Sequence, residues 1–205
     1  MTDYTQLPFN LPVPQDDGAS SHLLEKSLPD VILLSTSGKP VDLSYIQGQA
    51  VFFCYPMTGQ PGVELPNGWD SIPGARGCTP QSCSFRDRYR ELQTLDTQVY
   101  GISTQKSSTQ LEAVERLHIP YELLSDADFE LTTSLQLPTF ELENLRYIKR
   151  LTLIVRGSKI VKVFYPIFPP ERNIVDVVEW LKQNKSRLQE FPYQKRSRFE
   201  QLQFR

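Results

Sequence analysis

Two cysteines at a spacing of five, Cys78 and Cys83, are the residues of this chain whose type and position best suit chemistry. They lie in the segment GARGCTPQSCSFRD, residues 74–87. Thr79 is the expected N-cap of a helix there, and Pro80 suits its first position, where a missing N–H costs nothing. Cys78 would then lie at a helix N-terminus, where free N–H groups and the helix dipole favour the thiolate, the nucleophilic form of cysteine.

The same helical geometry separates the two thiols. Cys78 heads the apolar stripe that continues through Phe85, whereas Cys83 lies about 140° away on a more polar face. Ideal helical spacing puts the two Cα atoms roughly 8–9 Å apart, beyond the ~7 Å limit for a disulfide without backbone movement. We therefore expect a switch in which the folded helix presents Cys78 and local unwinding lets Cys83 reach it.

Length and composition bound the class of protein. A chain of 205 residues suits one domain with tails, and its net charge of −2 argues against a nucleic-acid or membrane partner for the chain as a whole. Three cysteines, two of them close together, do not form a secreted disulfide framework, so we expect a reducing, cytoplasmic location. The polar, Pro-rich residues 1–21 indicate no signal peptide, and no stretch has the length of a membrane span.

The elements that must position the two thiols predict an α/β fold. Expected strands are 28–35, 41–43, 51–55, 98–103, 121–124, 149–155 and 159–165, and expected helices are 79–95, 107–117, 127–135 and one that starts near Pro170. A strand, a crossover helix and a parallel strand are followed by a hairpin and a closing helix, the order of a thioredoxin-like fold with an added N-terminal β-hairpin. The expected domain spans 27–183, between an arm (1–26) and a basic tail (184–205).

The connection over residues 57–74 is unusually long and rich in Gly and Pro. Connections beyond about 12–15 residues in a compact domain are usually functional or disordered. Trp69 and Ile72 indicate that this one packs on the domain, either as an ordered excursion or as a lid over the Cys78 pocket. The third cysteine, Cys54, falls in the strand before it and is expected to be a buried core thiol.

Residues 77–87, GCTPQSCSFRD, resemble the active-site segment of peroxiredoxins of the Q, or bacterioferritin-comigratory, type. Three further segments agree in the same order: FCYP at 53–56, GIS at 101–103 and LLSD at 123–126. The segment RLTLIV at 150–155 resembles the strand that carries the family's catalytic arginine. The resemblance covers roughly residues 28–183.

This resemblance implies a thiol peroxidase that reduces hydrogen peroxide and organic hydroperoxides. Cys78 would be the peroxidatic cysteine and Cys83 the resolving cysteine, which condenses with the Cys78 sulfenic acid to form an intramolecular disulfide. Arg150 would stabilise the negative charge that develops in the reaction. Thioredoxin or glutaredoxin would reduce the bridge, and the family needs no metal or organic cofactor. The sequence leaves open whether the protein is a monomer or a weak homodimer.

The chain departs from the family pattern before the peroxidatic cysteine. Where the family has a proline, and a threonine or serine, seven and three residues ahead, this chain has Ser71 and Ala75. The lost hydroxyl normally hydrogen-bonds the peroxide and the sulfur in that family. Thr58 or Ser71 could fold back and replace it, and we expect Thr58 to do so. Arg76 and Arg86 are local rivals for the role of the catalytic arginine.

Three other interpretations compete with a peroxidase. A copper-binding redoxin would need a histidine ligand near the cysteines, and His22 and His118 are poor candidates for it. A redox-regulated interaction protein would be oxidised without turnover. A general thiol–disulfide oxidoreductase would normally carry Cys-x-x-Cys, which is absent. The tripeptide Leu137-Pro138-Thr139 resembles the cis-proline turn of thioredoxins but comes too early before the final hairpin.

Overall fold

The computed structural model describes Tyr4 and residues 7–185, so the expected basic tail at 184–205 lies outside the described residues except for its first two positions. The strands are β1 (Ile32–Ser35), β2 (Pro40–Asp42), β3 (Gln49–Cys54), β4 (Thr97–Ser103), β5 (Glu122–Ser125), β6 (Thr139–Leu142), β7 (Leu145–Ile148), β8 (Leu151–Arg156) and β9 (Lys159–Phe164). The helices are α1 (Cys78–Asp87), α2 (Tyr89–Thr94), α3 (Ser107–Leu117), α4 (Glu130–Leu135) and α5 (Asn173–Gln183). Short 3₁₀ turns lie at Leu43–Tyr45, Trp69–Ser71 and Pro170–Arg172. Within the described part of the chain, no helix is both long and apolar enough to cross a bilayer.

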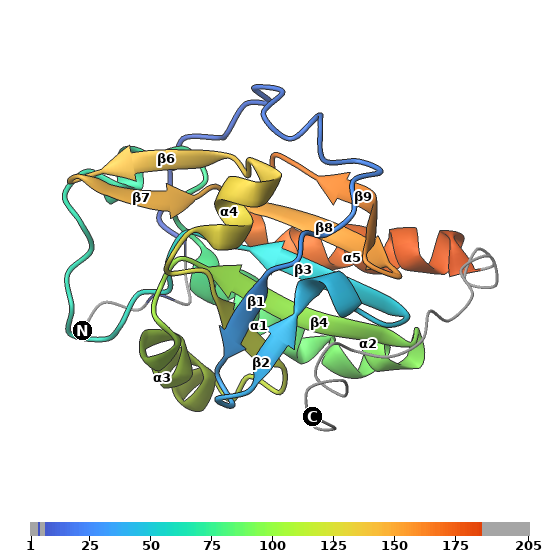
Figure 1. Cartoon of the computed structure of the whole chain (residues 1–205). Helices are drawn as coiled ribbons and strands as arrows, with labels where there is room; N and C mark the ends of the chain where they lie inside the picture. Colours follow the sequence, from blue (N-terminus) through green and yellow to red (C-terminus); the bar gives the residue numbers. More distant parts are fainter. Residues whose placement is uncertain (1–3, 5–6, 186–205) are drawn as a thin grey trace.

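The pairing of the strands confirms the predicted α/β order. The main sheet has seven strands in the order β2-β1-β5-β4-β3-β8-β9 (Figure 1). β3 and β4 run parallel and are joined through α1 and α2, while β8 and β9 form the expected antiparallel hairpin. β1 and β2 form the predicted N-terminal hairpin, which β1 attaches to β5. This arrangement puts β3 between a parallel and an antiparallel neighbour near the middle of the sheet.

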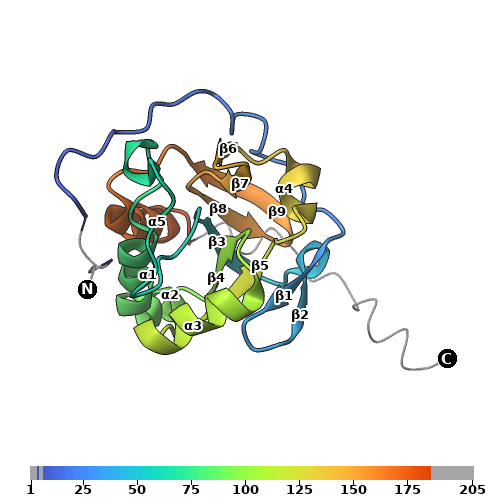
Figure 2. The same cartoon turned by 90° about the vertical axis from the view of Figure 1, so that its left-hand side faces the viewer.

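Alternate side chains of β3 face two separate cores. Val51 and Phe53 pack with α1, α2, α3 and α5, and Phe85 of α1 stacks on Phe53 with ring centroids 4.4 Å apart. Phe52 and Cys54 face the other side, among residues of α4 and of the chain before β1. Figure 2 shows α4 on the opposite side of the sheet from α1 and α5. β3 is buried along its whole length, as its continuous apolar run predicted, and Cys54 is a core thiol as expected.

The helix predicted over 79–95 is wrong in its start and in its continuity. It begins at Cys78, and Arg88, with φ −106° and ψ 12°, separates α1 from α2. The apolar spacing continues across this break, because Phe85 and Leu92 are both buried in the same core. The pattern of side chains therefore gives no sign of the break.

A second, two-stranded sheet, which the sequence did not predict, consists of β6 and β7. Its two turn residues, Glu143 and Asn144, both have positive φ, as two-residue hairpin turns require. Trp69, from the 57–74 connection, packs against Phe140 and Tyr147 of this hairpin, with ring centroids 5.8 and 5.0 Å away. The long connection is therefore an ordered excursion, held by an apolar cluster separate from the two main cores.

Residues 7–26 of the N-terminal arm follow the outside of the domain, past β6 and β9 (Figures 1 and 2). Residues 7–26 contain neither helix nor strand. Asp17 fixes the middle of the arm, because its carboxylate accepts hydrogen bonds from Lys149 Nζ at 2.7 Å and from the Tyr165 hydroxyl at 2.8 Å. These hydrogen bonds lower the pKa of Asp17 to about 2, and the bond from Lys149 has the largest effect. The carboxylate that holds the arm is therefore ionised at neutral pH.

Trp69→Ala should release the 57–74 connection while the main sheet stays folded. Truncating a buried tryptophan costs about 3–5 kcal/mol, and Trp69 is only 2 % exposed. Hydrogen exchange should show lost protection at the amides of Ser71 and Ala75, which bond within the connection. Trp180→Ala, in α5, is the matched control and should leave those amides protected. Unchanged exchange in Trp69→Ala would contradict this account of the connection.

Candidate active site

Helix α1 places Cys78 at its first position. Gly77, not Thr79, is the N-cap, and its φ of 98° lies in the left-handed region that L side chains rarely adopt. A Cβ at this position would also come within 2.5 Å of a proline side chain, so both backbone and space require glycine. Thr79 and Pro80 are instead the second and third helical residues. The missing N–H of Pro80 costs no intrahelical hydrogen bond there, because the first such bond is donated by Gln81, to the Gly77 carbonyl at 3.0 Å.

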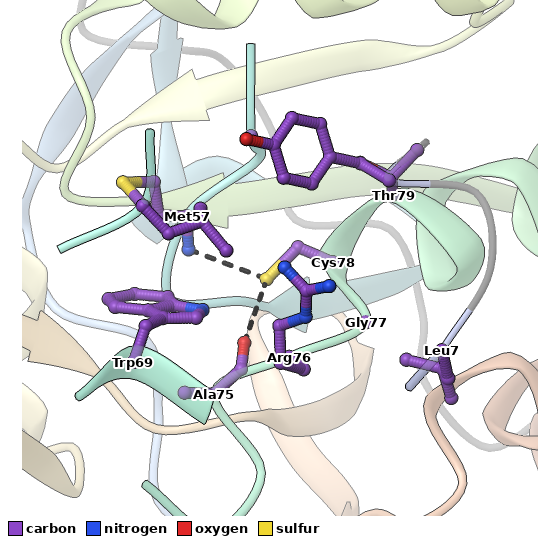
Figure 3. A pocket seen from close by; sticks show the side chains of 11 residues that line it. Leu7, Met57, Trp69, Ala75, Arg76, Gly77, Cys78 and Thr79 are labelled. Carbon is purple, nitrogen blue, oxygen red and sulfur yellow. Dashed lines mark hydrogen bonds between the residues drawn. The ribbon is translucent and has the colours of Figure 1, made fainter. Parts of the chain in front are cut away.

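The sulfur of Cys78 lies in a buried polar environment (Figure 3). The backbone N–H of Met57 donates to Sγ at 3.4 Å, and the guanidinium of Arg150 donates to it at 3.2 Å. In the thiol form, the S–H group donates to the carbonyl of Ala75 at 3.5 Å. Two N–H donors, one of them cationic, stabilise a negative sulfur more than a neutral one. The site therefore places two donors where negative charge on the sulfur would be stabilised.

Arg150 immediately precedes β8 and is 3 % exposed. Its Nη2 donates to the carbonyls of residues 74–76 at 3.3, 3.3 and 3.0 Å, as well as to Cys78. Its Nη1 donates to the side-chain oxygen of Gln81. Among the described residues, no carboxylate pairs with it. A buried cation without a counterion is costly, and the sulfur of Cys78 is the contacting group on which a negative charge would offset that cost.

Gln81 connects Arg150 to the closing helix. Its Nε2 donates to Oδ1 of Asn173 at 3.0 Å, and the same oxygen accepts from the hydroxyl of Thr152 at 2.7 Å. All four side chains are buried, so this row of polar contacts fixes the guanidinium against α1 and α5. Gln81 was not among the predicted site residues. Its position three residues after Cys78, on the same face of α1, indicates that the two side chains lie close together.

Thr58 is the expected site residue that the structure does not bring to the sulfur. Its hydroxyl and its N–H both donate to Oε1 of Gln105, at 3.1 and 2.9 Å. The side chain is buried, but it does not line the hollow beside Cys78. The expectation that its hydroxyl takes the missing place is thus corrected: the preceding residue, Met57, provides a donor through its backbone N–H instead.

Cys83 lies half-buried on another face of α1. Burial raises the pKa of its thiol, and the nearby guanidinium of Arg86 opposes that effect. Arg86 donates to a carbonyl at the end of α3 at 2.7 Å, and both it and Arg76 pair with neighbouring aspartates. Within the described part of the chain, Arg150 is therefore the arginine that donates to the sulfur of Cys78.

A small hollow opens beside Cys78. Its volume is about 20 Å³, which is room for about one water-sized molecule. The residues that line it are Tyr4, Leu7, Met57, Gly59, Leu65, Trp69, Ala75, Arg76, Gly77, Cys78 and Thr79. Figure 3 shows Met57 and Trp69 on one side of the sulfur and Leu7 on the other. The long connection is thus an excursion that also forms a wall of the site.

The remaining residues singled out in the sequence lie away from this hollow. Nε2 of His22 is 2.8 Å from the carbonyl of Leu135, at the end of α4. His118 is exposed at the end of α3. Pro138 precedes β6, and the cis peptide bonds of the described residues precede Pro166 and Pro169 instead. Neither histidine lines the hollow beside Cys78.

A family model described as Redoxin matches residues 24–178, well over half of the chain. The chain belongs to the redoxin family. Over 110 residues, this redoxin is 33 % identical to peroxiredoxin bcp1 of Schizosaccharomyces pombe, and the match covers 53 % of this chain and 49 % of that relative. The chain therefore spans about half the length of bcp1. Over 159 residues it is 28 % identical to the chloroplastic peroxiredoxin Q of Arabidopsis thaliana, with 77 % of this chain and 66 % of the relative covered.

Solved structures of Q-type peroxiredoxins share the fold of this redoxin. Peroxidoxin BcpB of Mycobacterium tuberculosis matches with a TM-score of 0.64 at 24 % identity, covering 78 % of this chain and 96 % of that one. Peroxiredoxin Q of Xanthomonas campestris matches with a TM-score of 0.63 at 18 % identity, covering 80 % and 98 %. These matches confirm the thioredoxin-like fold, and the curated relatives confirm the resemblance to Q-type peroxiredoxins.

Arg150→Met should lower the second-order rate of Cys78 oxidation by hydrogen peroxide by about 10²–10³-fold, because it removes a preorganised donor from the reacting sulfur. Arg150→Lys should recover part of this loss, since lysine keeps the charge but not the planar fork of donors. The rate is measured in a single turnover by stopped-flow fluorescence. Arg146→Met, an exposed arginine of β7, is the matched control. A folded Arg150→Met protein that reacts at the wild-type rate would exclude this role.

The pKa of Cys83 predicts how this thiol responds to pH. Because burial raises that pKa above the ordinary value of 9.0, less thiolate forms at any pH below it. In a variant with Cys54→Ser and Cys78→Ser, iodoacetamide should alkylate Cys83 more slowly than a small free thiol at neutral pH, and the rate should still be rising above pH 9. The same variant in urea should behave as a free thiol. Fast alkylation of the folded protein at pH 7 would refute the prediction.

Proposed function

We propose that this redoxin is a thiol-dependent peroxidase that uses Cys78 as its nucleophile and Cys83 as its resolving thiol. The observation that carries the proposal is the 3.2 Å contact between the Arg150 guanidinium and the sulfur of Cys78, beside a hollow of about peroxide size. Relatives named peroxiredoxin bcp1 and peroxiredoxin Q support the peroxidase activity. The substrates are hydroperoxides.

The first step is the attack of the Cys78 thiolate on one oxygen of the peroxide. An S–O bond forms, the O–O bond breaks, and the leaving oxygen takes up a proton and departs as water or an alcohol. Negative charge moves from sulfur to that leaving oxygen. The donors available to stabilise it are the guanidinium of Arg150, the N–H of Met57 and the free N–H groups at the start of α1.

In the second step the thiol of Cys83 condenses with the Cys78 sulfenic acid, so that a disulfide forms and water leaves. The helical spacing requires α1 to unwind first. Unwinding must break the hydrogen bond from the Tyr121 hydroxyl to the Ser82 carbonyl, at 2.7 Å, and the stacking of Phe85 on the central strand. A hydrogen bond of this kind contributes only about 0.5–1.5 kcal/mol, so the displacement of Phe85, which is fully buried, is the larger part of the cost of unwinding.

A small dithiol protein, thioredoxin or glutaredoxin, would then reduce the disulfide by thiol exchange. The reaction as written needs no metal and no organic cofactor. The burial of Cys78 favours a small peroxide over a protein disulfide as its substrate, because the residue is only 3 % exposed in the folded helix. The cytoplasmic location and the monomer or weak homodimer stay predictions.

Peroxide consumption in the presence of thioredoxin, its reductase and NADPH tests the proposal. Cys78→Ser should abolish turnover. Cys83→Ser should keep the first oxidation of Cys78 but lose thioredoxin-linked turnover, and Cys54→Ser is the matched control with near-wild-type turnover because Cys54 lies in the core. Peptide mapping after peroxide treatment should find one Cys78–Cys83 disulfide within the chain.

Other outcomes point to different mechanisms. One stoichiometric oxidation without turnover, with every dithiol tried, would favour a redox-regulated interaction protein. A disulfide from Cys78 to Cys54, or one between two chains, would contradict the assignment of Cys83 as the resolving thiol. Peroxide-independent exchange with a protein disulfide at a comparable rate would favour a general thiol–disulfide oxidoreductase.

A further inference from the structure

Tyr4 covers one side of the hollow beside Cys78. Its hydroxyl donates to the carbonyl of Val63 at 2.6 Å, and the guanidinium carbon of Arg76 lies 5.7 Å from the centre of its ring. The ring approaches Gly59 so closely that a Cβ built there would be 2.9 Å from its Cδ1 atom. Tyr4 is therefore held by the long connection on one side and by the residues before α1 on the other.

Leu7 covers the hollow from the helix side. Its Cδ2 atom lies 3.1 Å from where a Cβ at Gly77 would be, directly before the reactive Cys78. Figure 3 shows Leu7 across the sulfur from Met57. Both Tyr4 and Leu7 belong to the arm, which precedes the residues that match the redoxin family. This covering is thus an addition to the family domain.

We propose that Tyr4 and Leu7 determine the size of the peroxide that reaches Cys78, and restrict the enzyme to hydrogen peroxide and similarly small hydroperoxides. The inference rests on the proposed peroxidase function. With both side chains in place the hollow measures about 20 Å³, which admits one molecule of about the size of water or hydrogen peroxide. A bulky organic hydroperoxide must displace the Tyr4 ring, which breaks the hydrogen bond from the Tyr4 hydroxyl to the connection. Fit differences of this kind discriminate by about 10–200-fold.

The test compares two oxidants in single-turnover oxidation of Cys78, followed by stopped-flow fluorescence. The readout is the ratio of the second-order rate with cumene hydroperoxide to that with hydrogen peroxide. Tyr4→Ala and Leu7→Ala should each raise this ratio at least about tenfold over wild type. Phe9→Ala is the matched control, because Phe9 lies on the same arm and is 97 % exposed, so its ratio should not change.

Gly59→Ala provides an independent variant that leaves the sequence of the arm intact. Its new methyl group would collide with the Tyr4 ring, whereas its backbone does not lie in the left-handed region, so the residue itself tolerates alanine. Displacement of Tyr4 should raise the ratio in this variant also. The same direction in Tyr4→Ala and Gly59→Ala would tie the effect to the position of the ring.

Two results would overturn the inference. One is a wild-type protein that already reacts equally fast with both oxidants, and the other is an unchanged ratio in the folded Tyr4→Ala, Leu7→Ala and Gly59→Ala variants. Either result leaves the peroxidase function intact. A wild-type protein whose Cys78 reacts with neither oxidant would instead overturn the proposed function, and this inference with it.

Discussion

A buried cation placed against a thiol is the interaction on which this structure depends. Arg150 is 3 % exposed and has no carboxylate partner among the described residues. Three backbone carbonyls from residues 74–76 and the Gln81 side chain accept hydrogen bonds from its Nη1 and Nη2 groups, whereas its buried Nε has no partner among the described residues. These neutral acceptors do not balance its charge. The sulfur of Cys78 is the group in contact with it that can become negative. The donors that meet this sulfur are therefore positioned by the packing of the whole domain, and not by the helix end alone.

The parts of this arrangement that the sequence predicts are those that depend on local patterns. The continuous apolar run of β3, the buried stripe of α5 and the glycine turn before Cys78 are each visible within a few residues. Only the resemblance to a family predicted that Arg150 lies beside Cys78, because no local pattern indicates that an arginine before a strand is buried. The hairpin of β6 and β7 was missed because its strands are short and partly exposed, and Trp69, which packs on them, comes from about 70 residues earlier. Thr58 failed as a site residue because a backbone N–H, which leaves no trace in side-chain patterns, reaches the sulfur instead.

Helix α1 has to satisfy two opposing requirements. Its first two turns must be rigid, since Gln81 holds the arginine and Phe85 fills the core under the central strand. In the proposed mechanism the same turns must unwind when Cys83 resolves the oxidised sulfur. The break at Arg88 bears on this conflict, because it ends α1 after 10 residues and gives α2 its own buried contact through Leu92. Unwinding of α1 thus leaves α2 and the strand that follows it in place.

Two segments meet beside the sulfur of Cys78: residues of the arm, which precede the part of the chain that matches the redoxin family, and the connection between β3 and α1, which lies within that part. The connection between β3 and α1 is anchored by Trp69 on the β6–β7 hairpin and walls the hollow, while the arm is anchored by Asp17 and closes over it. Neither segment provides a charged side chain that touches the sulfur; that charge comes from Arg150, while the connection provides the backbone atoms of Met57 and Ala75. The connection therefore contributes both a wall of the hollow and contacts to the sulfur, whereas the arm contributes only side chains that cover the hollow. In the proposed peroxidase, a change in the arm can thus alter which peroxide enters without altering the contacts of Cys78 with Arg150 and Met57.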